Sequence, residues 1–428
     1  MKRFARHILA ESLAVLARVV IAKYRPTIVM VTGSVGKTSA KEASAAVLAD
    51  SFFSRKSEKS FNTEFGVPFT IFGVKNPWMN PLSWLGVFRE ALALALLPNH
   101  YPNLLVLEVG ADRPGDLERI LSIATPDAVV VTRLPEVPVH VEAYATPEAL
   151  REEEFQPAYA LPPAAPLIIS ADDAHALSMA KRLPVRTLTY GVAKDADIRI
   201  FDIKTGIEDG VPSATASVRA GESVGQITLR GTVGRQQLFA AAAALALALS
   251  LEVPFQKALE ALSSYETPPG RMRVFAGIHG SKVIDDSYNA SPVALEEALA
   301  ALAEFPEAKR RIAVLGDMLE LGRYSVAEHS RLGAATPHAA DIVVGVGIRM
   351  RALTKAAREA GMDEQAVLSF DNSKEALAAL PSLVLPGDVI LVKGSQSMRM
   401  ERLVAGLLAN PADAAKLVRQ EREWKKRS

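Results

Sequence analysis

The feature that most constrains this chain is the segment VMVTGSVGKTS at residues 29–39. Apolar, mostly β-branched residues at 28–31 predict a buried strand, and the alanine-rich run at 40–48 predicts a helix. Gly33 and Gly36 stand between them and are followed by Lys37 and Thr38. This order is typical of a phosphate-binding loop. The alternative is an ordinary strand–turn–helix unit with a lysine placed there by chance.

Each part of this loop has a chemical reason. Glycines let the backbone turn tightly, so that its N–H groups and the start of the next helix point at phosphate oxygens. Lys37 supplies a cation for the β- and γ-phosphates, and the Thr38 hydroxyl can ligate Mg²⁺. The longer form of the motif needs glycine at position 31, which is Val31, so this is the shorter form TGxxGKT. The predicted ATP-binding residues of the loop are Gly33, Ser34, Val35, Gly36, Lys37, Thr38 and Ser39.

The composition limits the classes of protein to which the chain can belong. A chain of 428 residues is too long for one ordinary core, so two or three domains are expected. Its net charge of +1 gives no bulk field that would favour nucleic acid or an anionic membrane. The absence of cysteine excludes disulfides, thiolate metal sites and cysteine nucleophiles. We therefore expect a cytoplasmic α/β protein that does not bind nucleic acid.

Strand and helix patterns alternate along most of the chain. Apolar strands are predicted at 28–31, 104–109 and 128–132, followed by a more polar β meander at 197–233 and an alanine-rich helix at 239–251. The sequence TPPG at 267–270 is the best domain boundary. The alternation then restarts with strands at 283–285, 312–315, 342–346 and 389–392, and the charged tail 419–428 is predicted to fray. The predicted parts are an amphipathic helix at 1–25, a central ATP-binding domain at 26–268 and a C-terminal domain at 269–428.

Two apolar segments lie outside this scheme. Residues 4–22 are rich in alanine and leucine, but charged residues interrupt them, so a membrane-spanning helix is not expected. Residues 77–101 hold two of the three tryptophans and an apolar helix. We expect both segments to pack on the first domain. The alternative is weak contact of 1–25 or 77–101 with a membrane surface, or with an apolar substrate or partner.

Acidic residues and a histidine follow the predicted strands. Glu108 follows the apolar run 104–107 near the end of the strand at 104–109, and His140 comes after the strand at 128–132. Ligands of doubly wound folds bind at the carboxyl ends of strands, where a carboxylate can hold Mg²⁺ against a nucleotide. The run Glu152–Glu154 follows soon after. These residues predict a site for one or two Mg²⁺ ions, although a surface histidine and an exposed acidic helix face explain the same pattern.

Ten motifs then carry a resemblance to a known family. They are TGSVGKTS (32–39), SFNTEFGVP (60–68), LEVGADRPGD (107–116), PDAVVVT (126–132), HVE (140–142), SADD (170–173), GRM (270–272), DDSYNASP (285–292), VLGDMLELG (314–322) and VKGS (392–395). In this order and spacing the chain resembles the ATP-dependent Mur ligases over nearly its whole length. It looks most similar to the branch that adds D-alanyl-D-alanine, to which DDSYNASP and GDMLELG are quite specific.

The resemblance implies roles for individual residues. Lys37 and Thr38 would bind the triphosphate and the first Mg²⁺, Glu108 would bridge two metals, His140 would serve the second, and Asn62 would lie near the γ-phosphate. The linker and second domain would bring further nucleotide contacts, which are Arg271, Asp286, Tyr288 and Asn289. From the residues alone, Arg271 and Asp286 are equally typical of a structural salt bridge. The implied site for the incoming amine comprises Asp317, Glu320, Lys393 and Ser395.

Three departures from the family pattern matter. The family has a separate N-terminal domain that grips the UDP-sugar of its substrate, whereas only residues 1–25 precede the central domain here, so recognition without UDP is expected. The family usually has a carbamylated lysine after His140, and the register places Glu154 there, so Glu154 is predicted as a metal ligand. The adenine-contacting helix usually carries asparagines, for which Gln237 is one substitute and Ala240 is not.

The resulting prediction is a P-loop central domain with a mostly parallel, doubly wound sheet, plus a C-terminal Rossmann-like α/β domain. We expect an ADP-forming ligase that uses ATP and Mg²⁺ to form an amide bond through an acyl phosphate. Its carboxylate substrate would be a cell-wall muropeptide, and its amine substrate would be an amino acid or a dipeptide. The expected partners are therefore small-molecule or peptide substrates. The alternatives are a non-catalytic nucleotide-binding relative and a poly-γ-glutamyl or folate-type ligase. The loop at 316–322 argues against the second.

Overall fold

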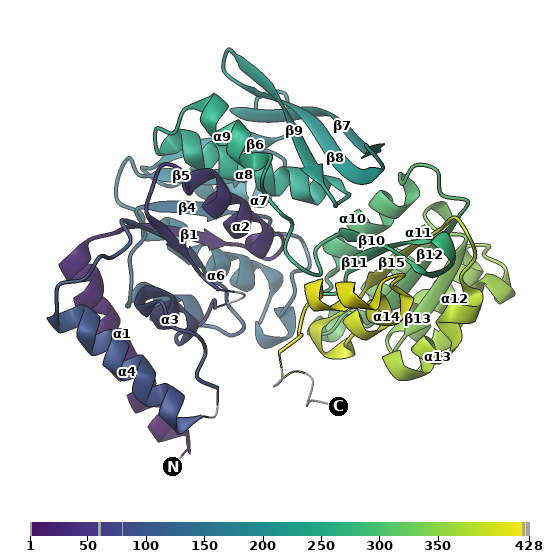
Figure 1. Cartoon of the computed structure of the whole chain (residues 1–428), viewed down its shortest axis with the longest axis horizontal. Helices are drawn as coiled ribbons and strands as arrows, with labels where there is room; N and C mark the ends of the chain where they lie inside the picture. The colour runs from purple at the N-terminus through teal and green to yellow at the C-terminus, as the bar shows by residue number, and fades with distance from the viewer. Residues whose placement is uncertain (1, 59–60, 79, 422–423, 425–428) are drawn as a thin grey trace.

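The computed structural model describes residues 2–58, 61–78, 80–421 and 424. The chain forms two β-sheets, each covered by helices, which lie side by side (Figure 1). The first sheet contains β1 (Thr27–Thr32), β2 (Ser54–Lys56), β3 (Leu104–Glu108), β4 (Ala128–Val131), β5 (Pro166–Ser170), β6 (Arg186–Gly191), β7 (Ile198–Glu208), β8 (Val211–Ala220) and β9 (Ser223–Arg230). Its helices are α1 (Lys2–Tyr24), α2 (Lys37–Leu48), α3 (Gly66–Phe72), α4 (Pro81–Leu96), α5 (Asp116–Leu121), α6 (Pro147–Tyr159), α7 (Ala174–Ala180), α8 (Arg235–Ser250) and α9 (Phe255–Leu262).

The first sheet runs in the order β2-β3-β1-β4-β5-β6-β7-β8-β9. Neighbouring strands are parallel from β2 to β7, and β7, β8 and β9 form an antiparallel meander. The strand β1 lies between β3 and β4, so that Met30 pairs with Leu107 on one side and with Val129 on the other. The chain therefore changes direction across the sheet beside β1, and such a point is where open α/β sheets bind ligands.

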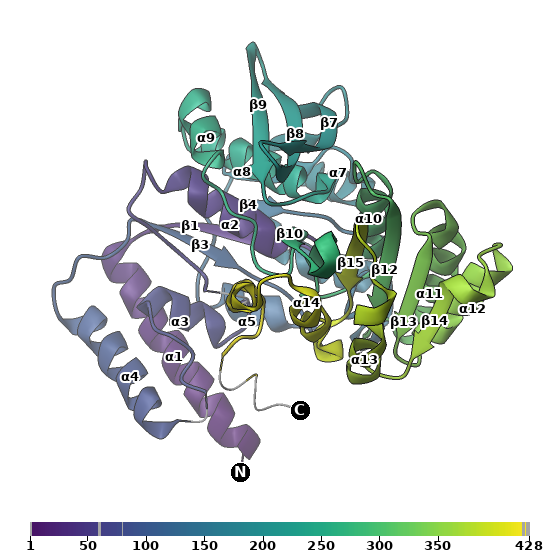
Figure 2. The same ribbon diagram turned by 45° about the vertical axis from the view of Figure 1, so that its right-hand side comes forward.

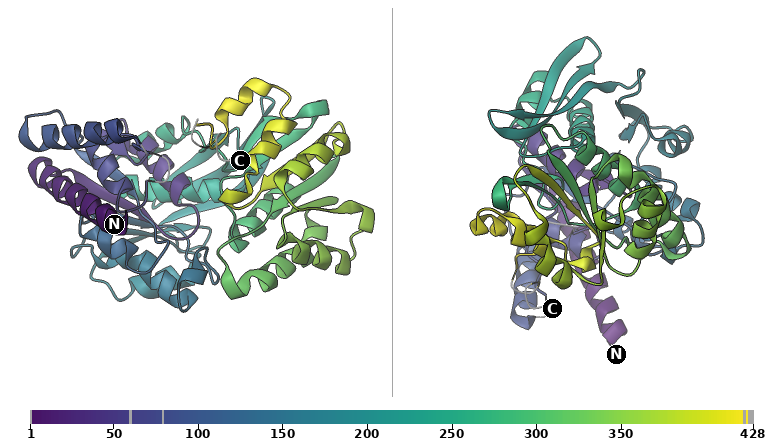
Figure 3. Two further views of the ribbon diagram at one scale, coloured as in Figure 1. Left: turned by 90° about the horizontal axis from the view of Figure 1, so that it is seen from below. Right: turned by 90° about the vertical axis from the view of Figure 1, so that its right-hand side faces the viewer.

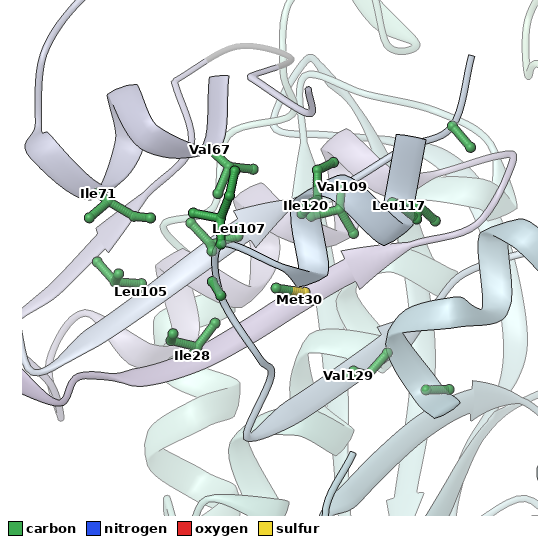
Figure 4. Packing of buried hydrophobic residues seen from close by; sticks show 14 of the residues in the cluster. Ile28, Met30, Val67, Ile71, Leu105, Leu107, Val109, Leu117, Ile120 and Val129 are labelled. Atoms are coloured by element: carbon green, nitrogen blue, oxygen red, sulfur yellow. The ribbon is translucent and has the colours of Figure 1, made fainter. Parts of the chain in front are cut away.

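Alternation along the strands supplies two cores. Residues such as Ile28 and Met30 point to one face, where they meet Ile71 of α3 and Ile120 of α5 (Figure 4). Val29 and Val31 point to the other face, which packs against α2 and α8. The helix α8 is fully buried over most of its length and is rich in alanine. Small side chains allow a helix to lie close to a sheet, which brings the start of α8 toward the phosphate loop.

The second sheet runs in the order β10-β11-β15-β12-β13-β14 and is parallel except for β10. Its strands are β10 (Arg273–Ala276), β11 (Lys282–Asp286), β12 (Arg310–Gly316), β13 (Ile342–Val346), β14 (Val367–Phe370) and β15 (Asp388–Lys393). Its helices are α10 (Pro292–Ala303), α11 (Ser325–Ala335), α12 (Met350–Glu359), α13 (Ser373–Leu383) and α14 (Glu401–Leu407). Asp286 and Lys393 are paired at the carboxyl ends of neighbouring strands.

The predicted fold class is confirmed, since two mostly parallel sheets carry helices on their faces. The strand at 342–346 has its predicted limits. The helix predicted at 239–251 instead begins at Arg235, because the polar residues Arg235, Gln236 and Gln237 form its first turn. The short strands β2, β10 and β14 were not predicted, since three or four residues show no clear periodicity. The domain limits at 25 and 268 stay predictions.

The helices α1 and α4 lie side by side at the end of the molecule remote from the second sheet (Figures 2 and 3). The ammonium of Lys23 donates to the carbonyls of Leu94 and Leu97 at 2.8 and 2.6 Å, and thereby caps the C-terminus of α4. The ring of Tyr24 stacks on Tyr101 with centroids 4.5 Å apart. Both helices therefore end at the same place and run parallel. Within the described residues, no helix has the length and apolarity needed to cross a membrane.

Candidate active site

The loop after β1 has the backbone that a phosphate site requires. Gly33 and Gly36 have φ angles of 113° and 92°, which L-residues with side chains rarely adopt. A Cβ at Gly33 would also lie 2.5 Å from Oγ1 of Thr132. The helix α2 starts directly at Lys37, whose ammonium folds back and donates to the carbonyl of Gly33. The loop is thus closed around the lysine that would contact phosphate.

Glu154 lies against this loop. It comes from α6, is 1% exposed, and accepts a hydrogen bond from the Ser34 hydroxyl. Its other carboxylate oxygen is 4.0 Å from Nζ of Lys37. Burial raises the pKa of Glu154, and the charge of Lys37 and the hydrogen bond from Ser34 oppose that rise. An exposed helix face is therefore the wrong interpretation for Glu154, although it holds for Glu152, whose side chain is 49% exposed.

Glu108 lies next to Thr38 at the end of β3. It is 2% exposed, and its Oε1 accepts a hydrogen bond from the Thr38 hydroxyl at 3.1 Å. Its Oε2 is buried and accepts no hydrogen bond within the described part of the chain, although Nζ of Lys41 is 3.6 Å away. The structure therefore joins a carboxylate and a hydroxyl at the start of α2.

Lys41 is a functional candidate that the sequence prediction missed. It lies one helical turn after Lys37, is fully buried, and donates to the carbonyl of Ser57 at 2.8 Å. Its ammonium is also 2.9 Å from Oε1 of Glu42. A lysine in the first turns of a helix usually faces water, so only the i, i+4 spacing from Lys37 could have indicated this position. Lys41 holds Glu108 from the side opposite Thr38.

The side-chain oxygen atoms of Glu108 and Thr38 are suitable ligands for Mg²⁺. The ion prefers oxygen ligands and is usually held by one or two carboxylates together with water and substrate phosphates. Glu108 and Thr38 offer a carboxylate with an oxygen free of hydrogen bonds and a hydroxyl, side by side. Among the described residues, no group of three or more His, Asp or Glu side chains is arranged to hold a metal. His140 and Glu154, the other predicted ligands, instead contact separate partners.

Asn62 meets Lys37 across a glycine. A Cβ at Gly110 would lie 3.0 Å from Nδ2 of Asn62 and 3.4 Å from Cε of Lys37, so the two side chains converge over that position. The carbonyl of Asn62 accepts a hydrogen bond from the N–H of Gly110 at 3.3 Å. Any larger residue at 110 would push these two groups apart.

His140 links the two sheets. Its backbone has a φ of 70°, and its Nδ1 lies 2.7 Å from Oε2 of Glu320, which belongs to the loop after β12. Asp112 is 3.6 Å from Nε2. Burial lowers the pKa of His140, but the hydrogen bond and charge of Glu320 and the charge of Asp112 outweigh burial, so the pKa is raised. The pairing brings a predicted metal ligand and a predicted substrate residue into direct contact.

Arg271 and Tyr288 also come from beyond the first sheet. The guanidinium of Arg271 lies 4.1 Å from the ring centroid of Tyr288 and donates to Oγ1 of Thr38 at 3.4 Å. Gln237 is 2% exposed, and its amide donates to the carbonyl of Arg271 at 3.2 Å. The Oε1 of Gln237 is buried without a hydrogen-bond partner in the described residues.

One cavity of about 580 Å³ gathers most of the predicted residues. Those lining it are Ser34, Val35, Gly36, Lys37, Thr38, Asn62, Glu108, His140, Arg271, Tyr288, Asn289, Glu320 and Ser395. Lys393 does not line it, because this lysine is buried and forms an ion pair with Asp286 at 2.5 Å. Asp317 does not line it either, because its carboxylate accepts from the N–H of Met350 at 2.9 Å. These three residues support the cavity from behind.

Arg419 was predicted to fray and does not. It is 7% exposed, pairs with Glu401 at 3.0 Å, and donates to the carbonyl of Ser287 at 3.2 Å. Its guanidinium lies 5.6 Å from the ring centroid of Tyr288. The partners are 18 and 132 residues away along the chain, so no local pattern could have indicated them. Most of the tail beyond Gln420 lies outside the described residues.

Comparison with known proteins gives one consistent family. Residues 31–248 match the Mur ligase middle domain, and residues 270–396 match the Mur ligase glutamate ligase domain. A UDP-N-acetylmuramoyl-tripeptide–D-alanyl-D-alanine ligase of Mycobacterium bovis is 30% identical over 90% of this chain and 73% of its own length. The enzyme of that name from Bacillus subtilis is 25% identical over 92% and 79%.

A solved structure adds a nucleotide complex. The crystal structure of MurF ligase from Thermotoga maritima in complex with ADP matches with a TM-score of 0.76 and 27% identity. The match covers 93% of this chain and 83% of the other. The two domain matches and the similar relative agree on one family, and the chain belongs to the Mur ligase family.

Proposed function

We propose that this protein is an ATP-dependent ligase of the MurF type, which joins D-alanyl-D-alanine to the carboxylate of a muropeptide. The supporting observation is that one cavity brings Lys37, Thr38 and Glu108 of the first sheet together with Glu320 and Ser395 of the second. The relatives named for this reaction match about nine-tenths of the chain. We infer a chemistry of two steps at this shared cavity.

In the first step the substrate carboxylate attacks the γ-phosphorus of ATP. The bond to the β-phosphate oxygen breaks, and ADP and an acyl phosphate form. Lys37 faces the phosphates and balances their charge, Asn62 orients the γ-phosphate, and Arg271 reaches the same loop from the linker. Mg²⁺ bound by Thr38 and Glu108 would supply further charge neutralisation during phosphoryl transfer.

In the second step the neutral amine attacks the acyl carbon, the bond to phosphate breaks, and an amide forms as the nitrogen passes a proton to the departing phosphate. Glu320 and Ser395 line the cavity on the side of the second sheet, where the amine would enter. Water must be excluded, since it would hydrolyse the acyl phosphate. The contacts from Arg271 to Thr38 and from His140 to Glu320 hold the two sides together and support such exclusion.

The reaction is tested by measuring ADP release. We expect ADP and the ligated muropeptide in equal amounts when ATP, Mg²⁺, a UDP-linked muramoyl tripeptide and D-alanyl-D-alanine are all present. Each substrate is then left out in turn, and the tripeptide is also supplied without UDP. If ADP is released at the same rate with and without the tripeptide and the dipeptide, and no amide product forms, the protein binds nucleotide for another function.

We further propose that Glu154 supplies the carboxylate that the carbamylated lysine provides in relatives. A glutamate is ionised near neutral pH without CO₂, so removal of CO₂ should leave the activity unchanged. We expect Glu154→Gln to raise the Mg²⁺ concentration for half-maximal turnover several-fold, because the buried negative charge beside Ser34 and Lys37 is lost. Titration of turnover with Mg²⁺ measures the effect.

The same substitution has an expected effect on stability. Burial raises the pKa of Glu154 in the folded protein above its value in the unfolded chain. Ionised Glu154 therefore lowers the stability of the folded protein at pH values above the unfolded pKa. The stability increases as the pH falls through the folded pKa. Without nucleotide, Glu154→Gln should therefore melt at or above the wild-type temperature at neutral pH. Glu152→Gln, on the exposed side of α6, is the matched control. If turnover depends on Mg²⁺ concentration in the same way in the wild type and in both variants, Glu154 is not a metal ligand.

A further inference from the structure

We propose that the outer face of α4, with the adjoining α1, docks this protein on an anionic lipid surface. This face lies at the end of the molecule remote from the second sheet (Figures 2 and 3). The proposal concerns where the protein sits, and it does not depend on which reaction the cavity performs.

The first observation is a leucine stripe on α4. Its members lie on one side of the helix, since their spacings of three, seven and four residues follow the helical period. They are Leu82, Leu85, Leu92 and Leu96, which are 79%, 69%, 46% and 75% exposed. The opposite side of α4 is buried through Val87, Ala91 and Leu94. The helix thus has two apolar sides, and the body of the protein covers only one of them.

The second observation is that such residues concentrate here. Of the fourteen large hydrophobic side chains exposed among the described residues, eight belong to α1, to α4 or to the residue after α4. From α1 these are Ile8, Val15 and Val19, which share one helix face by their spacing of seven and four residues. Exposed apolar side chains that gather on neighbouring elements indicate a binding site for a protein or a membrane.

The charge of the segments that carry α1 and α4 favours an anionic membrane over a second copy of this protein. Residues 1–25 and 73–103 together hold eight Lys and Arg but only two Glu, a net charge of +6, so the rest of the chain carries −5. Arg89 lies within the leucine stripe and is exposed, whereas Arg6 of α1 pairs with Glu64 at 3.4 Å. Lys75 and Arg18 are exposed nearby. Two copies of this surface would repel each other, whereas anionic headgroups would attract it.

The geometry also suits a lipid surface. A helix of 16 residues is about 24 Å long, and a helix on a protein surface that exposes an apolar side can lie in the plane of the headgroups with that side inserted. The aliphatic part of Arg89 can insert while its guanidinium stays at the phosphates. Because Lys23 already fixes the end of α4 against α1, no segment has to fold on binding.

Co-sedimentation with vesicles tests the proposal. The full chain is mixed with vesicles of phosphatidylcholine alone, or of equal parts phosphatidylcholine and phosphatidylglycerol. We expect binding to the anionic vesicles only, and its loss at high salt. The triple variant Leu85→Gln, Leu92→Gln, Leu96→Gln should bind about a hundredfold more weakly, because three inserted leucines are lost. ADP release in vesicle-free solution should be unchanged.

The matched control replaces three exposed hydrophobic residues on the second domain, Val326→Gln, Ile348→Gln and Leu385→Gln, which are 70%, 68% and 52% exposed. This control should bind vesicles like the wild type. The proposal is overturned if the wild type stays in the supernatant of anionic vesicles, or if both triple variants lose binding equally. It is also overturned if sedimentation velocity shows a dimer that only the stripe variant dissociates, since a second copy would then cover the stripe.

Discussion

Replacing Lys37 with alanine should reduce the rate of ligation at least about a hundredfold, which corresponds to roughly 3 kcal/mol of transition-state stabilisation. The expectation follows from the position of the ammonium, which is folded over the glycine loop beside Asn62 and within reach of any phosphate in the cavity. Alanine keeps the helix start intact but leaves the charge that develops during phosphoryl transfer unbalanced. The measurement is kcat/KM from ADP release at saturating Mg²⁺.

Folding must be checked alongside, because Lys37 is also the closest cation to the buried carboxylate of Glu154. We expect the circular dichroism spectrum of Lys37→Ala to match that of the wild type. Lys75→Ala, which removes an exposed lysine far from the loop, is the control and should keep full activity. If Lys37→Ala turns over at a rate near that of the wild type, the loop does not bind the reacting phosphates.

The second large effect is expected at Lys41. Lys41→Met should lower the free energy of unfolding by about 3–5 kcal/mol, because removing one partner of a buried ion pair leaves the other charge uncompensated. The side chain is fully buried between Glu42, Glu108 and the carbonyl of Ser57. The unpaired Glu108 would also lose its orientation toward Thr38. Urea-induced unfolding, followed by fluorescence, measures the loss.

A neighbouring lysine provides the control. Lys56 pairs with the same Glu42, but its side chain is 47% exposed. Exposed ion pairs contribute only about 0–1 kcal/mol, so Lys56→Met should hardly move the urea midpoint. If Lys41→Met and Lys56→Met unfold at the same urea concentration, burial of the Lys41 charge carries no stability. Magnesium titration of both variants then separates support of Glu108 from a general loss of stability.

Some of this arrangement could be predicted from local sequence. Strand ends carry Glu108 and the loop with Thr38 to the same edge of the sheet, because β3 and β1 are parallel neighbours. That rule needs only the order of strands and helices. The motif GKT similarly predicts a phosphate loop from chemistry that is complete within a few residues.

Other parts depend on distant packing and leave no local trace. Lys41 would be assigned to a solvated helix face, since nothing near it in sequence announces the buried carboxylate of Glu108. Arg419 looks like part of a charged tail until Tyr288 and Glu401 come beside it. Lys393 was predicted to be part of the site for the incoming amine, and only the structure shows that it is buried and paired with Asp286. Charged residues are assigned to water by default, and only the fold reveals which of them are enclosed.

The position of β1 has a consequence for synthesis on the ribosome. This strand is the first of the sheet to be made, yet both of its neighbours, β3 and β4, come later. Roughly 100 residues must follow Thr32 before β4 can pair with it, which takes on the order of 5–20 s at typical rates of translation. During that time the nascent chain exposes an apolar strand together with α1 and the leucines of α4. A chaperone that binds apolar segments at the ribosome would have its main opportunity on this protein before residue 131 emerges.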